Sequence, residues 1–459
     1  TYGSHRLGAW QGAGRAAMSR AIAFDILRDV TANDAYANLA LAKRLATAEL
    51  STRDAAFVTE LVSGTCRFMG TYDVIIAMAG NRKLNTLQPA VVDVLRLGAH
   101  QLLSMRIPPH AAVGATVELA KSRIGKRVGG VVNAILRKIS ARTLDEWTEL
   151  AAKGKDQTAA AALRGHHPAW VTRALADVLP SGELEEALTA NNLAPVPTLV
   201  VRPGLADIDE LDGKPCSYSP FGAVREGDPS DVPAVLEGRA GVQDEGSQLM
   251  ALALTRAEAP SGPWLDMCAG PGGKAALLAG LAKQRDTFLL ASEAHEHRAQ
   301  LVQRAVACYG DVPVITADGT RPAWAPRSFA RVMVDVPCSG LGALRRRPES
   351  RWRRTERDVL DLQPLQQALL SSALDATMPG GVVAYVTCSP HRAETRDVVH
   401  EIVAGRSDVE LLDAPALLPE VADCADGPFV QLWPHRHGTD AMFLALIRKV
   451  DPDTTSQAR

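Results

Sequence analysis

Two cysteines in the carboxyl-terminal half of the chain are the first candidates for chemistry. Cys338 stands in the run Asp-Val-Pro-Cys-Ser-Gly, directly after an apolar segment at 331–336. Cys388 stands in Thr-Cys-Ser-Pro, after a second apolar segment at 382–387. A thiolate is a strong nucleophile where its surroundings lower the pKa of the thiol. A lone cysteine is more often an inert core residue, but two in the same context favour covalent catalysis.

A glycine-rich turn is the second candidate. The apolar segment 264–268 runs into Ala-Gly-Pro-Gly-Gly, and a helix is expected to begin near Lys274. Such a turn lets a ligand approach the free backbone amides at a helix N-terminus. The spacing is not G-x-G-x-x-G and there is no G-K-[ST], so the turn favours S-adenosylmethionine over a dinucleotide or a triphosphate. The alternative is a tight turn with a capping glycine.

Two acidic residues support a cofactor that contains a nucleoside. Glu293 follows the apolar segment 288–292, and Asp318 follows the segment 312–316. A carboxylate at the first position can accept hydrogen bonds from both hydroxyls of a ribose. One at the second position can approach the edge of an adenine. Together with the glycine turn, these acids favour ligand binding over a purely structural turn.

A methyl donor beside two thiols suggests one particular reaction. Carbon 5 of cytosine is a weak nucleophile until a thiolate adds to carbon 6 and turns the ring into an enamine-like nucleophile. Asp335, three residues before Cys338, can hydrogen-bond the amino group and ring nitrogen of the base, which selects cytosine over uracil. The hypothesis is therefore methyl transfer to carbon 5 of cytosine through a covalent cysteine adduct.

An arginine-rich stretch begins five residues after Gly340. Its members are Arg345, Arg346, Arg347, Arg351, Arg353, Arg354 and Arg357. Guanidinium groups suit phosphates, and Trp352 among them suits stacking on an unpaired base. We expect this stretch to bind RNA. The alternative is a solvated loop whose arginines pair with carboxylates of the protein.

The composition is that of a globular protein, and the net charge does not indicate nucleic-acid binding. Any such binding must therefore depend on a local basic segment. The chain has 459 residues, of which 46% are apolar and 22% charged, and a formal net charge of −2. Its apolar runs are too short for a membrane span, and its start does not read as a secretory signal. The seven cysteines are scattered without a C-x-x-C pair, which argues against disulfides and zinc. We expect a cytoplasmic monomer without a metal or membrane partner.

The pattern of apolar residues predicts three regions. Residues 15–145 repeat apolar positions at helical spacing, which indicates an all-α domain of about six helices. Residues 165–240 combine a helical piece, a short β-branched strand and loops rich in Gly, Pro and Asp, as in a small α+β module. Residues 241–450 alternate strands and helices, which indicates a Rossmann-like α/β domain with a largely parallel sheet. The strands are expected at 264–268, 288–292, 312–316, 331–336 and 382–387. Since parallel strands end at one edge, the glycine turn and the cysteines should meet there.

These motifs resemble the RNA cytosine-5 methyltransferases, and specifically their bacterial 16S ribosomal RNA branch of the Sun/Fmu type. The matching stretches are 266–274, 335–342 with the arginines behind it, 387–389, 438–443 and the entry segment 243–248. The helical N-terminal region resembles the NusB-like RNA-binding domain that this branch carries. The resemblance therefore covers nearly the whole chain.

The resemblance implies roles for individual residues. Cys388 would be the nucleophile, Cys338 would assist product release, and Asp335 would contact both cofactor and base. The S-adenosylmethionine site would comprise Cys268, Ala269, Gly270, Pro271, Gly272, Gly273, Lys274, Glu293, Asp318 and Asp335. Three positions depart from the usual pattern: Gly270 replaces alanine, Ala275 replaces a common threonine, and Ala441 replaces a common glycine. None of them is a proposed catalytic thiol.

Two other functions compete with RNA methylation. A degenerate methyltransferase domain could serve as an RNA-binding scaffold without catalysis. A DNA cytosine methyltransferase would use Cys338 as the nucleophile and leave Cys388 idle. Because the sequence keeps both thiols and the glycine turn, it favours a catalyst acting on RNA.

Overall fold

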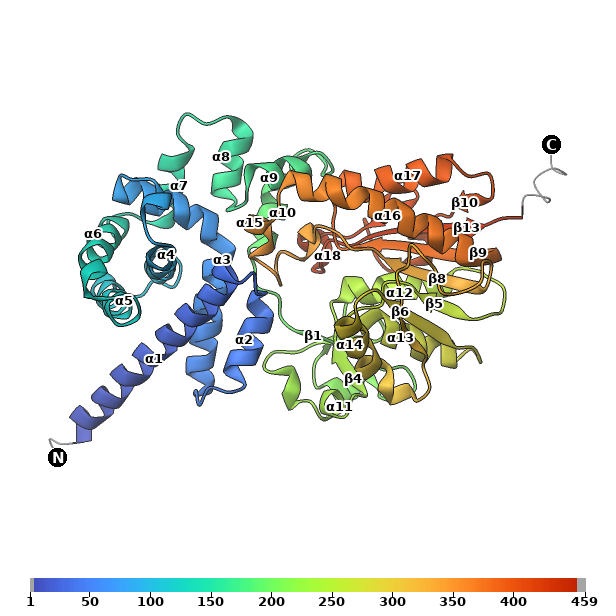
Figure 1. Ribbon diagram of the computed structural model, residues 1–459, viewed down its shortest axis with the longest axis horizontal. Helices are drawn as coiled ribbons and strands as arrows, with labels where there is room; N and C mark the ends of the chain where they lie inside the picture. Colours follow the sequence, from blue (N-terminus) through green and yellow to red (C-terminus); the bar gives the residue numbers. More distant parts are fainter. Residues whose placement is uncertain (1–3, 452–459) are drawn as a thin grey trace. The chain divides into compact units, whose positions relative to one another are not determined.

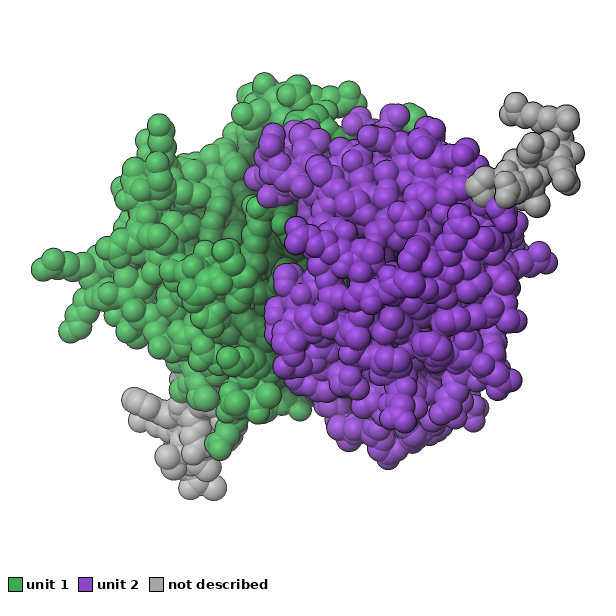
Figure 2. Space-filling view, turned by 45° about the vertical axis from the view of Figure 1, so that its right-hand side comes forward, with its two compact units in different colours: residues 1–176, 180–192, 344–354 green, residues 177–179, 193–343, 355–459 purple. Residues whose placement is uncertain are grey.

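The computed structural model describes residues 4–451, and the chain divides into two compact units, coloured separately in Figure 2. Unit 1 contains the residues up to Ala176, together with Pro180–Asn192 and Leu344–Arg354. Unit 2 contains Asp177–Leu179, Leu193–Ala343 and the residues from Thr355 onward. The chain therefore passes back into unit 1 after it has begun unit 2.

Unit 1 is helical throughout its described residues. Its helices are α1 (Ser4–Ala32), α2 (Ala37–Leu45), α3 (Thr52–Gly80), α4 (Pro89–Leu103), α5 (Pro109–Arg123), α6 (Gly129–Ile139), α7 (Leu144–Ala152), α8 (Gln157–Arg164), α9 (Ala169–Ala176), α10 (Leu184–Asn191) and the short α15 (Ser350–Arg353). Local signals place the ends of several of these helices. Ser51 caps α3 by accepting from the amide of Asp54, and proline occupies the first turn of α4 and of α5. The six helices expected near the amino terminus are confirmed (Figure 1).

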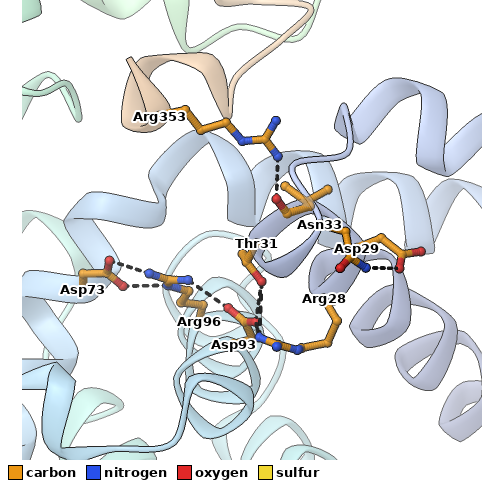
Figure 3. Close-up of polar contacts among 9 residues, drawn as sticks. Arg28, Asp29, Thr31, Asn33, Asp73, Asp93, Arg96 and Arg353 are labelled. Atoms are coloured by element: carbon orange, nitrogen blue, oxygen red, sulfur yellow. Dashed lines mark hydrogen bonds and ion pairs between the residues drawn. The ribbon is translucent and has the colours of Figure 1, made fainter. Parts of the chain in front are cut away.

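The core of unit 1 is apolar but contains one ionic network. Asp93, which is 1% exposed, accepts hydrogen bonds from Arg28 (2.5 Å), Thr31 (2.7 Å) and Arg96 (2.8 Å). Arg96 also holds both carboxylate oxygens of Asp73 at 2.6 Å (Figure 3). The network joins α1, α3 and α4, and its charges are mutually paired, as buried charges must be.

Unit 2 begins with a small antiparallel sheet of order β2-β3-β1-β4. Its strands are β1 (Thr198–Val201), β2 (Lys214–Pro215), β3 (Gly222–Val224) and β4 (Ala240–Val242). The buried carboxylate of Glu245, at the start of the following helix α12 (Glu245–Arg256), accepts from the amides of Tyr218 and Ser219. The entry segment thereby fixes this sheet to the helix that leads into the larger domain.

The larger domain of unit 2 is built on a sheet of order β11-β12-β13-β9-β8-β5-β6-β7, with β10 beside β13. The strands are β5 (Trp264–Asp266), β6 (Leu289–Glu293), β7 (Val314–Thr316), β8 (Phe329–Asp335), β9 (Thr377–Thr387), β10 (Val409–Leu411), β11 (Ala425–Asp426), β12 (Phe429–Gln431) and β13 (Phe443–Lys449). The strands from β7 to β9 pair in parallel at all five predicted positions, and β13 is antiparallel to β9. The Rossmann-like expectation is confirmed.

Helices cover both faces of this sheet (Figure 1). Helices α12, α13 (Gly273–Lys283) and α14 (Glu296–Val306) share one core with Trp264 and Val382. Helices α16 (Glu356–Ala376) and α17 (Arg396–Ala404) cover the opposite face and share a second core with Leu265 and Val383. Each of these two residues directly follows a residue of the first core, Trp264 or Val382. The alternation follows from the two-residue period of a strand, and it makes both faces of β5 and β9 apolar. Across the described part of the chain, no helix is both long and apolar enough to cross a membrane.

Candidate active site

The predicted reactive residues meet at the carboxyl edge of the central strands. In the parallel pairing of β8 with β9, Asp335 lies opposite Val386, so the loops that carry Cys338 and Cys388 leave the sheet side by side. β5, which leads into the glycine turn, pairs with β8 on its other side. This is the edge at which open α/β sheets place their ligands.

The two cysteines are in direct contact. The Sγ atoms of Cys338 and Cys388 lie 3.4 Å apart, within hydrogen-bonding distance for sulfur. The backbone around Cys388 is held by Gly342, whose amide donates to the Cys388 carbonyl at 2.8 Å and whose carbonyl accepts from Ala441 at 2.9 Å. A Cβ at Gly342 would lie 2.0 Å from the Ala441 oxygen, so this close approach requires glycine.

The surroundings of the two thiols differ in charge. The hydrogen bond from Cys338 lowers the pKa of Cys388, with a further contribution from the nearby Lys274. The same hydrogen bond, burial and the nearby Glu394 raise the pKa of Cys338. Cys388 is therefore the thiol that is more readily ionised, and Cys338 the one that keeps its proton.

Lys274 links the glycine turn to the same site. It lies in the first turn of α13, and its Nζ donates to Oδ2 of Asp335 at 2.8 Å. Its ammonium thus neutralises Asp335 and also acts on the Cys388 sulfur. One cation stabilises two neighbouring anions at the end of β8 and β9.

The glycine turn has the conformation expected of a ligand-binding loop. Gly272 caps α13 with a φ of +112°, and a Cβ there would lie 2.5 Å from the Cβ of Ala305. Arg298 donates to the Gly270 carbonyl at 2.7 Å, and a Cβ at Gly270 would lie 2.3 Å from the Glu293 Oε2 and 2.9 Å from the Arg298 Nε. The glycine found at this position in place of alanine gives the side chains of Glu293 and Arg298 room beside the turn.

Glu293 and Asp318 stand at the ends of the next two strands. Glu293 is 3% exposed and accepts from the amides of Gly270 (3.0 Å) and His295 (3.2 Å). Asp318 is exposed, and its Oδ1 accepts from the amide and hydroxyl of Thr320, which lowers the pKa of the carboxyl group. Glu293 therefore borders the turn, whereas Asp318 is bonded within its own loop.

The charges of the site suit S-adenosylmethionine. Asp266, at the end of β5, is 1% exposed, and neither of its carboxylate oxygens has a hydrogen-bond partner among the described residues. Burial and the nearby Asp335 raise its pKa to about 7. Lys274 pairs with Asp335 and Arg298 lies 3.6 Å from Glu293, so within the described part of the chain Asp266 is the one of these three acids without a cation against it. A cationic ammonium or sulfonium group of the cofactor would stabilise its carboxylate, so the residues present fit this cofactor.

The arginine-rich stretch divides between surface and interior, and the predicted RNA contact of Arg351 is wrong. Arg351 is 0% exposed and donates to the His166 carbonyl (3.1 Å), the Asn192 side chain (2.6 Å) and the Asn191 carbonyl (3.0 Å). Arg353 donates to the carbonyls of Val30, Asp34 and Ala35. Figure 3 shows its guanidinium group directed toward the end of α1. The Arg351 guanidinium is therefore buried inside unit 1, and that of the half-buried Arg353 is held by three backbone carbonyls.

Trp352 shares this internal role, contrary to the expected stacking on a base. Its Nε1 donates to the carbonyls of Cys66 (3.0 Å) and Arg67 (3.2 Å), and its ring packs where a Cβ on Gly70 would stand, 2.2 Å away. Arg346 and Arg347 are exposed, and the Arg347 guanidinium lies over the ring of Tyr36. Arg345 and Arg354 are half-buried, and Arg357 pairs with Asp361 on α16. The RNA contacts of Arg345, Arg346, Arg347 and Arg354 stay a prediction.

Sequence reasoning missed two buried acids of the site. Asp266 belongs to the glycine motif and stands directly before the turn, but the motif alone indicates no separate role for it. Glu394, six residues after Cys388, is 0% exposed and holds the Cys338 loop. A glutamate in a polar loop gives no sequence signal of burial, since loops are where acids are commonest.

The fold and site define an S-adenosylmethionine-binding methyltransferase domain joined to a helical domain. A family model described as "16S rRNA methyltransferase RsmB/F" matches residues 250–448, and the NusB family model matches residues 17–141. The crystal structure of the protein PH0851 has the same fold, with a TM-score of 0.76 and 21% identity over 95% of this chain and 98% of that one.

Relatives of known sequence cover almost the entire chain. A putative methyltransferase of Mycobacterium tuberculosis is 47% identical, over 94% of this chain and 96% of its own length. The probable ribosomal RNA small subunit methyltransferase B of Bacillus subtilis is 29% identical, over 94% of this chain and 98% of its own. The ribosomal RNA small subunit methyltransferase B of Salmonella heidelberg is 30% identical, over 79% and 85%. The chain belongs to the RsmB/F family of S-adenosylmethionine-dependent 16S rRNA methyltransferases.

Proposed function

We propose that the chain methylates carbon 5 of a cytosine in small-subunit ribosomal RNA, through a covalent bond between Cys388 and carbon 6 of the base. The observation that carries the proposal is the 3.4 Å contact between Cys338 and Cys388 at the edge that also bears the glycine turn. The names of the relatives support ribosomal RNA of the small subunit as the substrate. When bound, S-adenosylmethionine supplies an electrophilic methyl group.

The first step is the attack of Cys388. Its thiolate forms a bond to carbon 6, and the ring electrons move toward carbon 5 while the ring nitrogen takes a proton from solvent, which it returns when the product is released. Asp335 would orient that nitrogen and the amino group, and Lys274 keeps Asp335 in place at 2.8 Å. Carbon 5 would then take the methyl group as the bond between the methyl carbon and the sulfonium sulfur breaks.

The second step releases the product. The proton on carbon 5 passes to the Cys338 sulfur, the electrons of the broken C–H bond form the ring double bond, and the bond from carbon 6 to Cys388 breaks. Capture of Cys388 as a thioether removes the hydrogen bond and the charge that raise the pKa of Cys338. Cys338 can then release its own proton to solvent and serve as the base.

The hydrogen bond between the thiols favours this assignment over the DNA-type alternative with Cys338 as nucleophile. That bond lowers the pKa of Cys388, which Asp335 raises and Lys274 lowers, and it raises the pKa of Cys338, which Glu394 raises further. A thiol that keeps its proton in the free protein is a poor first nucleophile. The same two thiols in contact also count against a scaffold without catalysis.

Incubation with S-adenosylmethionine labelled in its methyl group tests the proposal. The expected product is 5-methylcytosine in small-subunit ribosomal RNA, identified by nuclease digestion and chromatography. DNA of the same sequence should remain unlabelled. Label on another atom, or on DNA alone, would overturn the proposal.

A further inference from the structure

Glu394 connects the two cysteine loops although it belongs to neither catalytic motif. It ends the short helix η7 (Arg392–Glu394) and is 0% exposed. Its Oε1 accepts from the amide of Ser339 at 2.7 Å, and its Oε2 accepts from the Ser339 hydroxyl at 2.5 Å. Ser339 directly follows Cys338, so one carboxylate holds both polar groups of the neighbouring residue.

The Glu394 carboxylate belongs to a network of hydrogen bonds that includes residues next to Cys338 and next to Cys388. Gln366 of α16 donates from its Nε2 to Glu394 (3.1 Å) and to the carbonyl of Pro337 (2.9 Å). The hydroxyls of Ser339 and Ser389 lie 3.1 Å apart, and Ser389 directly follows Cys388. Ser339 is therefore bonded to Glu394 directly, whereas Pro337 is linked to it through Gln366 and Ser389 through Ser339.

We propose that Glu394 is a positioning residue that holds Cys338, through Ser339, in the place required for product release. The inference rests on the proposed function, in which Cys388 attacks and Cys338 accepts the proton from carbon 5. Attack by Cys388 uses Cys338 only as the donor of the hydrogen bond that lowers the pKa of Cys388, so displacement of Cys338 should slow the attack less than it slows release. Release does need it, because the proton must pass to the Cys338 sulfur while the bond between carbon 6 and Cys388 breaks.

A purely structural role would not require a charged group at this place. Burial of a carboxylate costs free energy that only paired, well-directed hydrogen bonds recover, whereas a neutral side chain could fill the same space at a smaller cost. Hydrogen bonds to an ionised acceptor are shorter and about twice as strong as neutral ones. They hold a loop with the accuracy that proton transfer demands, since a displacement of about 1 Å can cost roughly 100-fold in rate.

The decisive experiment separates bond formation from release in the full-length protein. Glu394→Ala should form the covalent protein–RNA adduct and transfer the first methyl group at close to the wild-type rate. Its steady-state turnover should fall by about 100-fold, with the adduct surviving denaturing gels. Glu394→Gln should recover part of the turnover, because its amide oxygen can still accept from the Ser339 amide. The matched control is Glu401→Ala, an exposed glutamate on α17, which should behave as wild type.

The outcomes distinguish the inference from the proposed function. Equal losses in adduct formation and turnover by Glu394→Ala would make Glu394 merely structural and overturn the inference. If that variant fails to fold, Ser339→Ala supplies the same test, since it removes one of the two bonds and should also accumulate adduct. Cys338→Ala is the reference for a blocked release. If it forms no adduct, the proposed function fails, whereas adduct in Cys338→Ala but in neither of the other variants refutes only the role of Glu394.

Discussion

Lys274 and Asp335 form an ion pair of 2.8 Å that joins the cofactor turn to the end of β8, next to Cys388. Because Lys274 lowers the pKa of Cys388, replacement by methionine should raise it. The thiolate is the reactive form, so the rate of Cys388 alkylation should fall at neutral pH and recover as the pH rises.

Alkylation by iodoacetamide over a pH series, with the modified peptide identified by mass spectrometry, measures this shift without cofactor or RNA. Lys283→Met is the control, since Lys283 lies exposed at the end of the same helix. A pH profile of Lys274→Met that coincides with wild type would show that Lys274 does not act on Cys388.

The two thiols should fail in different ways when they are removed one at a time. Cys388→Ala should be inactive and form no adduct with RNA, because nothing attacks carbon 6. Cys338→Ala should methylate once and stay attached, because elimination stalls. Denaturing gels with labelled RNA give the answer. Adducts only in the Cys388 variant would exchange the two roles, and full activity in both variants would exclude thiol catalysis.

Glu293 should contribute to cofactor affinity through the ribose. Unpaired hydroxyls cost about 1–3 kcal/mol, so Glu293→Ala should weaken binding of S-adenosylmethionine roughly 5- to 150-fold by calorimetry. Glu293→Gln keeps the shape and one acceptor, and should lose less. Glu296→Ala is the control, because Glu296 lies three residues further on, where it bonds Thr316 at 2.8 Å. Unchanged affinity in a folded Glu293→Ala variant would remove Glu293 from the cofactor site.

The arginine-rich stretch should show two separable effects. Replacement of Arg345, Arg346 and Arg347 by alanine should weaken RNA binding and flatten its salt dependence. The expected change in slope is about two units, since each phosphate that is no longer neutralised contributes roughly 0.7. Titrations at several salt concentrations measure this slope. If it does not change, the triplet has a structural role as well.

Arg351→Ala should instead destabilise the protein, by roughly 2–5 kcal/mol, because it leaves a cavity and three buried acceptors without donors. Thermal unfolding followed by circular dichroism measures the loss. Arg357→Ala, an exposed arginine of the same stretch, should change stability by less than about 0.5 kcal/mol. Equal melting temperatures for the Arg351 variant and wild type would contradict its burial.

Local patterns in the sequence predicted those helices, strands and site residues whose positions follow from the residues of one short segment. The five parallel strands, the helical amino-terminal region and the convergence of the glycine turn with Cys338 and Cys388 all follow from periodicity and from the rule that parallel strands end at one edge. The short antiparallel strands beyond β9 were not predicted one by one, because segments of two or three residues carry too little pattern.

Arg351 and Glu394 mark the limit of such reasoning. Both are charged residues in polar segments, and composition alone places such residues at the surface. Their burial depends on partners that are distant in the sequence, Asn192 for Arg351 and Gln366 for Glu394. Pairings of this kind appear only in the folded chain.

The return of Leu344–Arg354 into unit 1 has a consequence for how the protein is made. A domain of contiguous sequence can fold as soon as it leaves the ribosome, amino terminus first. Unit 1 is still incomplete when Asn192 is synthesised, because Arg351, Trp352 and Arg353 follow more than 150 residues later. Until they emerge, the backbone carbonyls that they bind lack these donors. The helical unit is therefore completed only after residues 193–343 of unit 2 have been translated. A protein fragment that ends at Asn192 should have a lower free energy of unfolding than the same helices in the full chain.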